Sequence, residues 1–364
     1  MKKIVFIINS IRQARCIRRV EEFTGHGYEV EVYGFDREGD NRSMPDFPVE
    51  VVGIFTNGAN YLQRIRDIRN AIKDILETEY DKNNTIFYLF NLDVALAFRS
   101  IIKSGKYKYI YEVSDLTELV VSNMLIRKLL IWQNKRSMLK SLQVVLTSEG
   151  FCDYYSTIPR EKISIIPNKV NERCPAFRIS SRKLSLDKIK IGFVGIVRFE
   201  TVYNFAKVCK DCTNIEFHLY GLVSKGDKYA LMLEELAEKH NNIILHGAFK
   251  NPQDLPSIYE SIDMVLSAYP PTPGVIYAEP NKLYEAIYFR CPIIVNNGTF
   301  LGRKVNILNV GYVIDAMNEE NITTFVQSLN TVSYQEKVKA CFAISQKECL
   351  NINDGFFQKL ETLC

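Results

Sequence analysis

The feature that most constrains this chain is a strand–helix–strand pattern that runs through the first half and then starts again. Short apolar runs rich in Ile, Val, Phe and Tyr alternate with longer segments of helical periodicity. Strands that are apolar throughout are typical of a parallel sheet covered by helices on both faces. Because parallel strands need crossover connections, the repeated pattern predicts two doubly wound α/β domains. The length of 364 residues also corresponds to about two domains.

The first half, residues 1–169, begins with an apolar strand at Lys3–Ile8. A helical segment, Arg12–Thr24, follows and stops at Gly25-His26-Gly27, where glycine favours a helix C-terminus. The other strands and helices predicted in this half are Tyr28–Gly34, Val49–Ile54, Leu62–Glu77, Thr85–Phe90, Val94–Lys103, Tyr107–Val113, Asn123–Lys140, Val144–Ser148 and Ile163–Asn168.

Residues 170–188 are predicted to be a linker, because Ser, Arg and Lys dominate them without periodicity. The pattern restarts at Ile189–Val194 and predicts a second domain at 189–349. The other elements expected there are Tyr203–Cys209, Ile215–Tyr220, Tyr229–Lys239, Ile243–His246, Leu255–Ser261, Met264–Ser267, Asn281–Phe289, Pro292–Val295 and Gly311–Ile314.

Composition excludes several classes of protein. The net charge of +4 is too small for a nucleic-acid-binding domain. No apolar stretch approaches the ~20 residues of a spanning helix, and the N-terminal apolar run ends at Asn9, too early for a signal peptide. The single CxxC pair, Cys209 and Cys212, lacks a second pair of Cys or His, so we expect reduced thiols and no zinc. These features predict a cytoplasmic protein.

Ligands of doubly wound sheets bind at the carboxyl ends of the strands. In the second half this rule indicates a nucleotide site formed by the strand-end residues Gly195, Gly221, Gly247 and Phe249 and by the loop residues Gly274 and Tyr277.

A helix is expected to open directly after Pro280, with Asn281, Lys282, Leu283 and Glu285 in its first turns. The free N–H groups of a helix N-terminus, together with Lys282, predict a site for a diphosphate. Glu285 is able to accept two hydrogen bonds from a vicinal diol such as a ribose. The alternative is a capped surface helix with an ordinary Lys–Glu pair.

Four blocks of the second half, in this order, resemble the donor domain of family 4 glycosyltransferases. They are Gly192–Arg198, Phe217–Gly221, Ile244–Gly247 with Leu255–Tyr259, and Glu285-Ala286 with Cys291-Pro292. The first half is similar to the acceptor domain of that family at Arg12–Val20 and Gly25–Val30. The resemblance covers roughly the whole chain. It implies the GT-B fold, in which two Rossmann-like domains face each other across a cleft, and a helix within 350–364 that packs back on the first domain.

The resemblance also implies roles for single residues. Glu285 matches the family's ribose-binding glutamate, in a Pro-x-Lys-x-x-Glu form typical of a bacterial subgroup. Tyr277 stands where the family has a second glutamate that contacts the donor sugar, which leaves the identity of that sugar open. Arg198 corresponds to the arginine that holds the diphosphate, and Lys282 is expected to replace a lysine missing from this loop. Both would stabilise the charge on the departing diphosphate.

Acidic and basic residues also follow the strands of the first half. Asp115 is a candidate catalytic residue after Tyr107–Val113, and Asp93 follows Thr85–Phe90; the alternative for either is a helix N-cap. Three arginines with near-helical spacing either contact phosphates or form a solvated basic helix face, namely Arg12, Arg15 and Arg19.

The helix predicted at Asn123–Lys140 is basic and apolar at once. No acidic residue occurs from Leu119 to Ser148. The basic residues are Arg127, Lys128, Lys135, Arg136 and Lys140, interleaved with Leu, Ile, Met and Trp132. Such a helix either lies on an anionic membrane surface or packs its apolar face into its own core.

The sequence thus predicts a glycosyltransferase that moves a sugar from a nucleotide-sugar donor onto a lipid-linked glycan acceptor, at the inner face of the membrane. Capsule, O-antigen or exopolysaccharide synthesis is the expected context. The resemblance implies retention at the anomeric carbon. No paired Asp-x-Asp motif occurs, so neither a metal nor a further cofactor is expected. The rivals are a non-catalytic subunit with this fold and a GT-B-like sugar-nucleotide epimerase.

Overall fold

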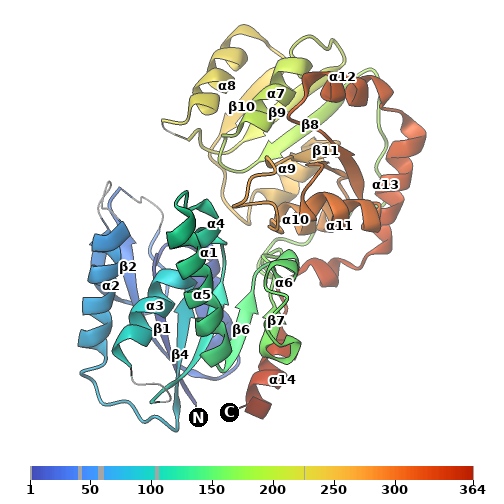
Figure 1. Cartoon of the computed structure of the whole chain (residues 1–364). Helices are drawn as coiled ribbons and strands as arrows, with labels where there is room; N and C mark the ends of the chain where they lie inside the picture. Colours follow the sequence, from blue (N-terminus) through green and yellow to red (C-terminus); the bar gives the residue numbers. More distant parts are fainter. Residues whose placement is uncertain (1, 40–42, 56–60, 103–105, 225, 364) are drawn as a thin grey trace. The chain divides into compact units, whose positions relative to one another are not determined.

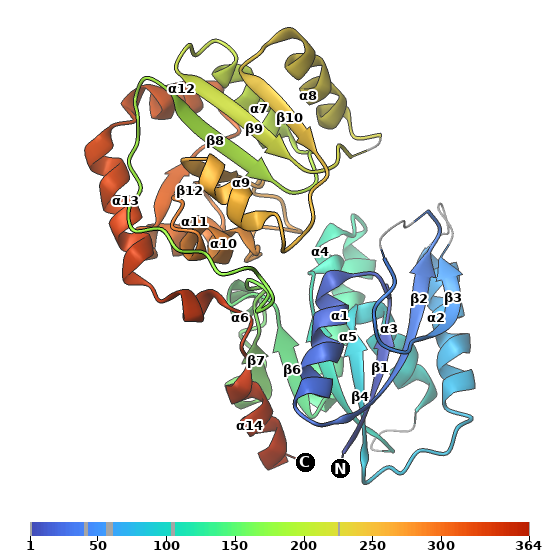
Figure 2. The ribbon, with the colours of Figure 1, turned by 180° about the vertical axis from the view of Figure 1, so that it is seen from behind.

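The computed structural model describes residues 2–39, 43–55, 61–102, 106–224 and 226–363. The chain divides into two compact units (Figures 1 and 2). Unit 1 is Met1–Ile166 with Asn353–Cys364, and unit 2 is Pro167–Ile352. Each unit is built on one parallel sheet with helices on both faces.

Unit 1 has a seven-stranded sheet in the order β3-β2-β1-β4-β5-β6-β7. The strands are β1 (Lys3–Ile8), β2 (Glu29–Arg37), β3 (Glu50–Phe55), β4 (Thr85–Phe90), β5 (Lys108–Val113), β6 (Gln143–Leu146) and β7 (Ile163–Ile165). Strand β1 pairs with β2 on one side and with β4 on the other, with Lys3 opposite Glu29 and Thr85. The strand order therefore reverses between β1 and β4, which is where doubly wound sheets bind ligands.

Helices cover both faces of the unit 1 sheet. One face packs against α1 (Ala14–Gly25) and α14 (Asp354–Leu363), where Phe356 and Phe357 contact Phe23 with ring centroids 6.0 and 5.0 Å apart. The other helices are α2 (Tyr61–Ile75), α3 (Asn91–Ile101), α4 (Thr117–Val120), α5 (Met124–Lys140), α6 (Gly150–Tyr154) and the 3-10 turn Arg160–Lys162. The last helix of the chain thus belongs to the core of unit 1.

Helix α3 begins three residues earlier than predicted, directly after β4. Asn91, the first residue of the helix, has φ 65°. Asparagine adopts this left-handed conformation more readily than most residues, so the strand turns into the helix at a single position. Lys103, the last residue of the predicted helix Val94–Lys103, lies outside the described residues.

Unit 2 has a six-stranded sheet in the order β10-β9-β8-β11-β12-β13. The strands are β8 (Ile189–Val194), β9 (Ile215–Tyr220), β10 (Ile243–Gly247), β11 (Met264–Ser267), β12 (Ile293–Asn296) and β13 (Gly311–Ile314). The helices are α7 (Glu200–Cys209), α8 (Lys228–Lys239), α9 (Leu255–Ser261), α10 (Lys282–Tyr288), α11 (Phe300–Leu308), α12 (Glu319–Ser328), α13 (Thr331–Ala343) and the 3-10 turn Gln346–Cys349. The strand order here reverses between β8 and β11.

Two features of unit 2 differ from the predicted element list. Helices α11, α12 and α13 were not predicted from the sequence. Residues 170–188 form no separate linker but run along unit 2, where Cys174, Phe177, Arg182 and Leu184 are buried. Arg182 donates to the carbonyl oxygens of Ile262 (2.7 Å) and Phe289, which fastens this polar segment to the domain.

Candidate functional site

The carboxyl ends of the unit 2 strands bring the predicted glycines together. Gly195 N–H donates to the Tyr220 carbonyl (2.8 Å), and Gly221 N–H donates to the Gly247 carbonyl (2.7 Å). Gly221 has φ 138°, and a Cβ placed on it would lie 1.7 Å from the Gly195 carbonyl oxygen. Only glycine fits at this position, so the backbones that follow β8 and β9 pack directly against each other. We call Gly195, Gly221 and Gly247 the glycine edge.

The loop after β8 holds Arg198 at the point where the strand order reverses. Arg198 is exposed, with its guanidinium 4.5 Å from the centroid of the Phe199 ring. Phe199 has φ 80°, a strained conformation for a bulky residue. Its ring packs edge-on against Tyr269, which follows β11, with centroids 5.3 Å apart. Strained backbone of this kind is found most often at ligand-binding and active sites, where the surrounding structure holds it in place.

Lys282 and Glu285 form a buried pair at the start of α10. The two residues are only 5% and 2% exposed, and Lys282 Nζ lies 2.5 Å from Glu285 Oε2. The Glu285 carboxylate also accepts hydrogen bonds from Tyr259 Oη (2.8 Å) and Asn281 Nδ2. The alternative of an ordinary surface Lys–Glu pair is therefore wrong, since an ion pair this buried is rigid and poorly solvated.

Tyr269 connects the two parts of the unit 2 site. Burial and the nearby charge of Glu285 raise the pKa of the Tyr269 phenol, and the positive charge of Arg198 partly opposes the shift. The Tyr269 phenol thus interacts electrostatically with a carboxylate from α10 and with a guanidinium from the loop after β8. Burial and Glu285 also raise the pKa of Tyr259, which keeps this phenol neutral as a donor to the carboxylate.

The other residues predicted for this site have different surroundings. Gly274 and Tyr277 lie half-buried in the loop before α10. Phe249 packs partly buried against the apolar core. Leu283 is fully buried, so its side chain stabilises α10 and only its backbone is available to a ligand.

Two polar partners of the α10 segment were not predicted from the sequence. Tyr259 holds Glu285 from α9, and nothing in its local sequence indicates this. Glu279 is buried and accepts from Lys304 Nζ (2.6 Å) and Tyr284 Oη. The segment before α10 is thus fastened by a second ion pair of its own.

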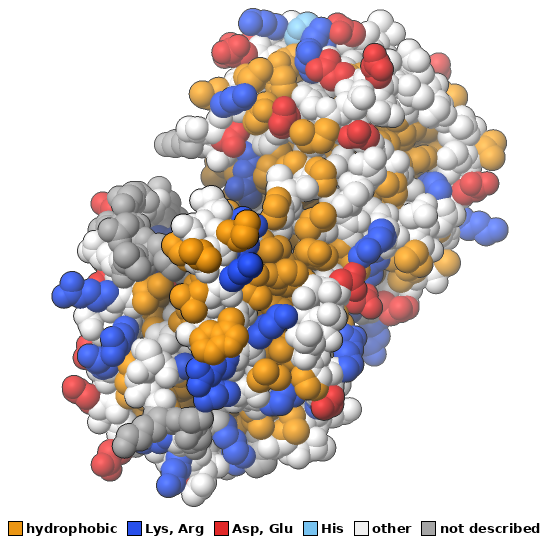
Figure 3. Space-filling model, viewed as in Figure 1, with side chains coloured by type: hydrophobic (Ala, Val, Ile, Leu, Met, Phe, Trp, Pro, Cys, Tyr) orange, Lys and Arg blue, Asp and Glu red, His pale blue; other side chains and the backbone are white. Residues whose placement is uncertain are grey.

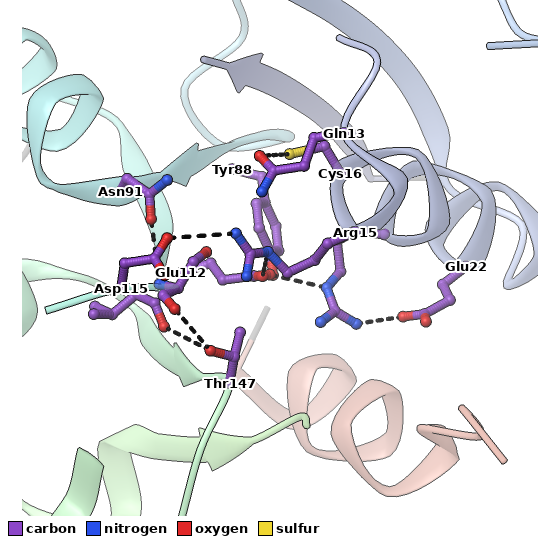
Figure 4. Close-up of polar contacts among 12 residues, drawn as sticks. Gln13, Arg15, Cys16, Glu22, Tyr88, Asn91, Glu112, Asp115 and Thr147 are labelled. Carbon is purple, nitrogen blue, oxygen red and sulfur yellow. Dashed lines mark hydrogen bonds and ion pairs between the residues drawn. The ribbon is translucent and has the colours of Figure 1, made fainter. Parts of the chain in front are cut away.

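In unit 1, polar side chains meet at the carboxyl end of β5 (Figure 4). Glu112 is fully buried and accepts from Arg19 Nε (3.0 Å) and from Tyr88 Oη. Arg15 lies between two carboxylates, 3.6 Å from Glu112 and 3.9 Å from Asp115. The Asp115 side chain is 65% exposed, which leaves it available to a ligand at this edge.

These contacts decide between the alternatives for the unit 1 residues. The three arginines do not form a solvated basic face, because Arg12 pairs with Asp36 (2.9 Å) and Arg19 is buried. The N-cap interpretation of the acidic residues is also wrong: α4 begins after Leu116, α3 begins after Phe90, and neither helix has a side-chain cap. Asp93 instead pairs with Arg64 (2.7 Å).

Helix α5 differs from the usual amphipathic helix, because its buried face is mostly polar and its exposed face is mostly apolar. Its buried residues are Asn134, Ser137 and Met138, and the first two are hydrogen-bonded within unit 1. Most of its large apolar side chains point outward, with Leu125 79% and Trp132 53% exposed, and Met138 is the buried exception. The alternative in which the apolar face packs into the protein's own core is therefore wrong.

Among the described residues, no three His, Cys, Asp or Glu side chains are placed to hold a metal ion. Cys209 and Cys212 are free thiols. The described helices are all too short or too polar to span a bilayer.

No protein-family model and no curated protein matches the sequence. Solved structures match the fold along the whole chain. Sucrose-phosphate synthase from Thermosynechococcus elongatus has a TM-score of 0.71 at 13% identity, with all of both chains covered. HepE from Anabaena, solved in complex with UDP, has a TM-score of 0.65 at 13% identity, again with all of both chains covered. A putative UDP-N-acetylglucosamine 2-epimerase from Listeria monocytogenes scores 0.58 at 11% identity, covering 93% of this chain and 91% of its own. Two parallel sheets and these likenesses establish that the chain has the GT-B fold.

Proposed function

We propose that this chain transfers a sugar from a nucleoside diphosphate donor to a glycan acceptor, and that unit 2 binds the donor. The observation that carries the proposal is the buried Lys282–Glu285 pair, in the same unit as the glycine edge and Arg198. The UDP bound to HepE supports a uridine nucleotide as the donor base.

In this proposal the chemistry is electrostatic. Arg198 is exposed and available to a phosphate, and Lys282 supplies a second positive charge at a fixed place. Both stabilise the negative charge that develops on the departing diphosphate, and neither needs a metal. Glu285 orients Lys282 and accepts from the ribose through its remaining lone pairs. Asp115 of unit 1 is the candidate base for the acceptor hydroxyl, with retention as the expected stereochemical course.

Incubation with a panel of UDP-sugars tests the proposal. We expect slow release of UDP from one sugar nucleotide in the absence of acceptor, and loss of this release in Arg198→Ala. Lys207→Ala is the matched control, since Lys207 pairs with Glu319 on the surface of α12. Epimerised sugar nucleotide as the product would instead identify an epimerase, and failure to bind any donor would identify a non-catalytic subunit.

We further propose that the acceptor is lipid-linked and that α5 rests on the inner face of a membrane, within surface-polysaccharide synthesis. Exposed apolar side chains alternate with Lys and Arg over α4 and α5 (Figure 3). They are Val120, Met124, Leu125, Ile126, Leu129, Trp132 and Leu139. No acidic residue occurs from 119 to 148, so the surface complements anionic lipid headgroups while its apolar side chains enter the interface.

Cosedimentation with vesicles tests this surface. We expect binding to phosphatidylglycerol vesicles that falls with added salt, and little binding to phosphatidylcholine. Leu125→Glu should abolish binding, whereas Val332→Glu, an equally drastic change at an exposed position of α13, should not. Equal binding to both vesicle types, or unchanged binding of Leu125→Glu, would rule the surface out.

A further inference from the structure

Unit 2 has a second concave site, away from the donor residues. A pocket of about 430 Å³ opens beside the end of α10 and is lined by Phe177, Arg178, Ser180, Arg290, Phe342 and Gln346, among others. Arg290 precedes β12 by three residues, so the pocket lies where the strands begin. Gly195 and Gly221 lie where strands end. The pocket and the proposed donor site therefore lie at opposite ends of the strands of one sheet.

Arg290 is a rigid, positively charged floor for this pocket. It is 8% exposed, and its Nη1 donates to the carbonyl oxygens of Cys341, Ile344 (2.8 Å) and Ile287 (3.3 Å). These bonds use one nitrogen of the guanidinium. The Phe342 ring lies 5.1 Å from its carbon and fixes its plane. Arg290 is thus preorganised, with Nε and Nη2 left for a further acceptor.

The positive charge of the pocket has no carboxylate partner in the described part of the chain. Neither Arg178 nor Arg290 forms an ion pair with any described Asp or Glu, and no acidic residue lines the pocket. Burial lowers the pKa of Arg290, because the guanidinium charge is less well solvated inside the protein than in water. A buried charge of this kind is stabilised by an anion that brings the missing negative charge.

The walls of the pocket are fixed and partly aromatic. Gln346 Nε2 donates to the carbonyls of Tyr288 (2.9 Å) and Phe177 (3.1 Å), which ties the segment carrying Arg178 and Ser180 to the end of α10. Phe177 and Phe342 offer apolar surface, and Ser180 offers a hydroxyl. The volume is in the range of small-molecule sites.

We infer that this pocket, formed by residues 177–180, Arg290, Phe342 and Gln346, is a second ligand site that binds a small phosphate-bearing molecule with a planar or apolar group. Arg290 and Arg178 hold the phosphate, and the two phenylalanines hold the rest. The site is distinct from the proposed donor site and does not depend on it.

Calorimetric titration of the whole chain with phenyl phosphate tests this site. We expect a Kd below about 1 mM and no binding of the uncharged benzyl alcohol. Arg178→Gln should raise the Kd about tenfold, because a charge-assisted hydrogen bond is lost. Arg178 is exposed, so this variant should fold, which thermal unfolding verifies.

Two further variants locate the ligand. Arg173→Gln changes a nearby exposed arginine outside the pocket, and Lys282→Ala changes the proposed donor site; both should leave the Kd unchanged. No binding at about 10 mM phenyl phosphate, well above the Kd we expect, would overturn the inference. So would an unchanged Kd in Arg178→Gln, or an equal rise in either control variant.

Discussion

At the residue scale, Glu285 shows which contacts can be predicted from the spacing of neighbouring residues and which cannot. Its spacing from Lys282 predicts that the two side chains share a face of the helix, and they do. The sequence does not indicate that Tyr259, 26 positions earlier, completes the cluster, because that contact depends on how α9 packs against α10. The same holds for Arg15 and Arg19, whose partner Glu112 comes from β5.

Glu112 is expected to be a stabilising residue, and Asp115 a ligand-facing one. Glu112→Gln removes one of the two carboxylates that pair with the buried guanidinium of Arg19, the other being Glu22, which should cost about 2 kcal/mol of unfolding free energy. Asp115→Asn, on an exposed side chain, should change stability by less than about 0.5 kcal/mol. Urea denaturation compares the two variants. Equal losses of stability would contradict the distinction.

Two stacked histidines should make stability depend on pH. His218 Nδ1 and His246 Nε2 are 2.9 Å apart on neighbouring strands. Burial lowers the pKa of both, and their proximity lowers that of His218 further, from a usual value of 6.5. The folded state therefore binds fewer protons than the unfolded state, so this stability is present above pH 6.5 and is lost as pH falls below it.

Unfolding free energies measured between about pH 7.5 and pH 5 check this dependence. The loss of stability on acidification should be smaller in His246→Gln, which removes one of the two groups. An identical pH dependence in both proteins would show that the histidine pair does not titrate as expected.

At the scale of elements, the glycine edge of unit 2 should be intolerant of a side chain at Gly221. Gly221→Ala places a Cβ against the Gly195 carbonyl at a backbone angle that alanine avoids, so the loops after β8 and β9 must separate. We expect loss of UDP binding with the sheet retained, measured by calorimetry and circular dichroism. Gly25→Ala, at a helix end with open space around it, is the matched control. UDP binding by Gly221→Ala at the wild-type Kd would show that the edge is not part of the donor site.

Strands were easier to predict than helices in this chain. Most strands of both sheets are short apolar runs, which are typical of a buried parallel sheet. Helices α12 and α13 were missed because Thr, Ser and Asn weaken their helical character. Their starts carry a signal that could have been used, since Asn318 and Asn330 cap the two helices. The outward turn of α5 could not be predicted, because its buried Asn134 depends on Tyr111 and Glu118 from other elements.

At the scale of the whole molecule, helix α14 forms part of the core of unit 1, although the rest of that unit comes from residues 1–166. Phe356, Phe357 and Leu360 of α14 are buried in the core of unit 1. Each contributes about 2 kcal/mol by burial, and three together approach the entire stability of a domain. A chain that ends at Ile352 should therefore lose the folded state of unit 1 while unit 2 remains folded.

Thermal unfolding followed by limited proteolysis measures this effect. Proteases should digest residues 1–166 of the truncated chain and spare a fragment from unit 2. A chain that ends at Leu360 removes only exposed residues of α14 among those described and should behave as the full chain does. If residues 1–166 resisted proteolysis in the chain that ends at Ile352, unit 1 would not need α14 to fold. The restart of the strand pattern at Ile189 predicted two domains. The prediction that a helix within 350–364 packs back on the first domain came from the family resemblance, because no local pattern in this segment indicates it.

The central claim is that unit 2 binds a nucleoside diphosphate through Arg198 and the Lys282–Glu285 pair. Calorimetric titration of the whole chain with UDP measures it directly. The account predicts saturable binding and a Kd raised about tenfold in Lys282→Ala, because a charge-assisted contact to the diphosphate is lost. An unchanged Kd in that variant, with the protein still folded, would contradict the account.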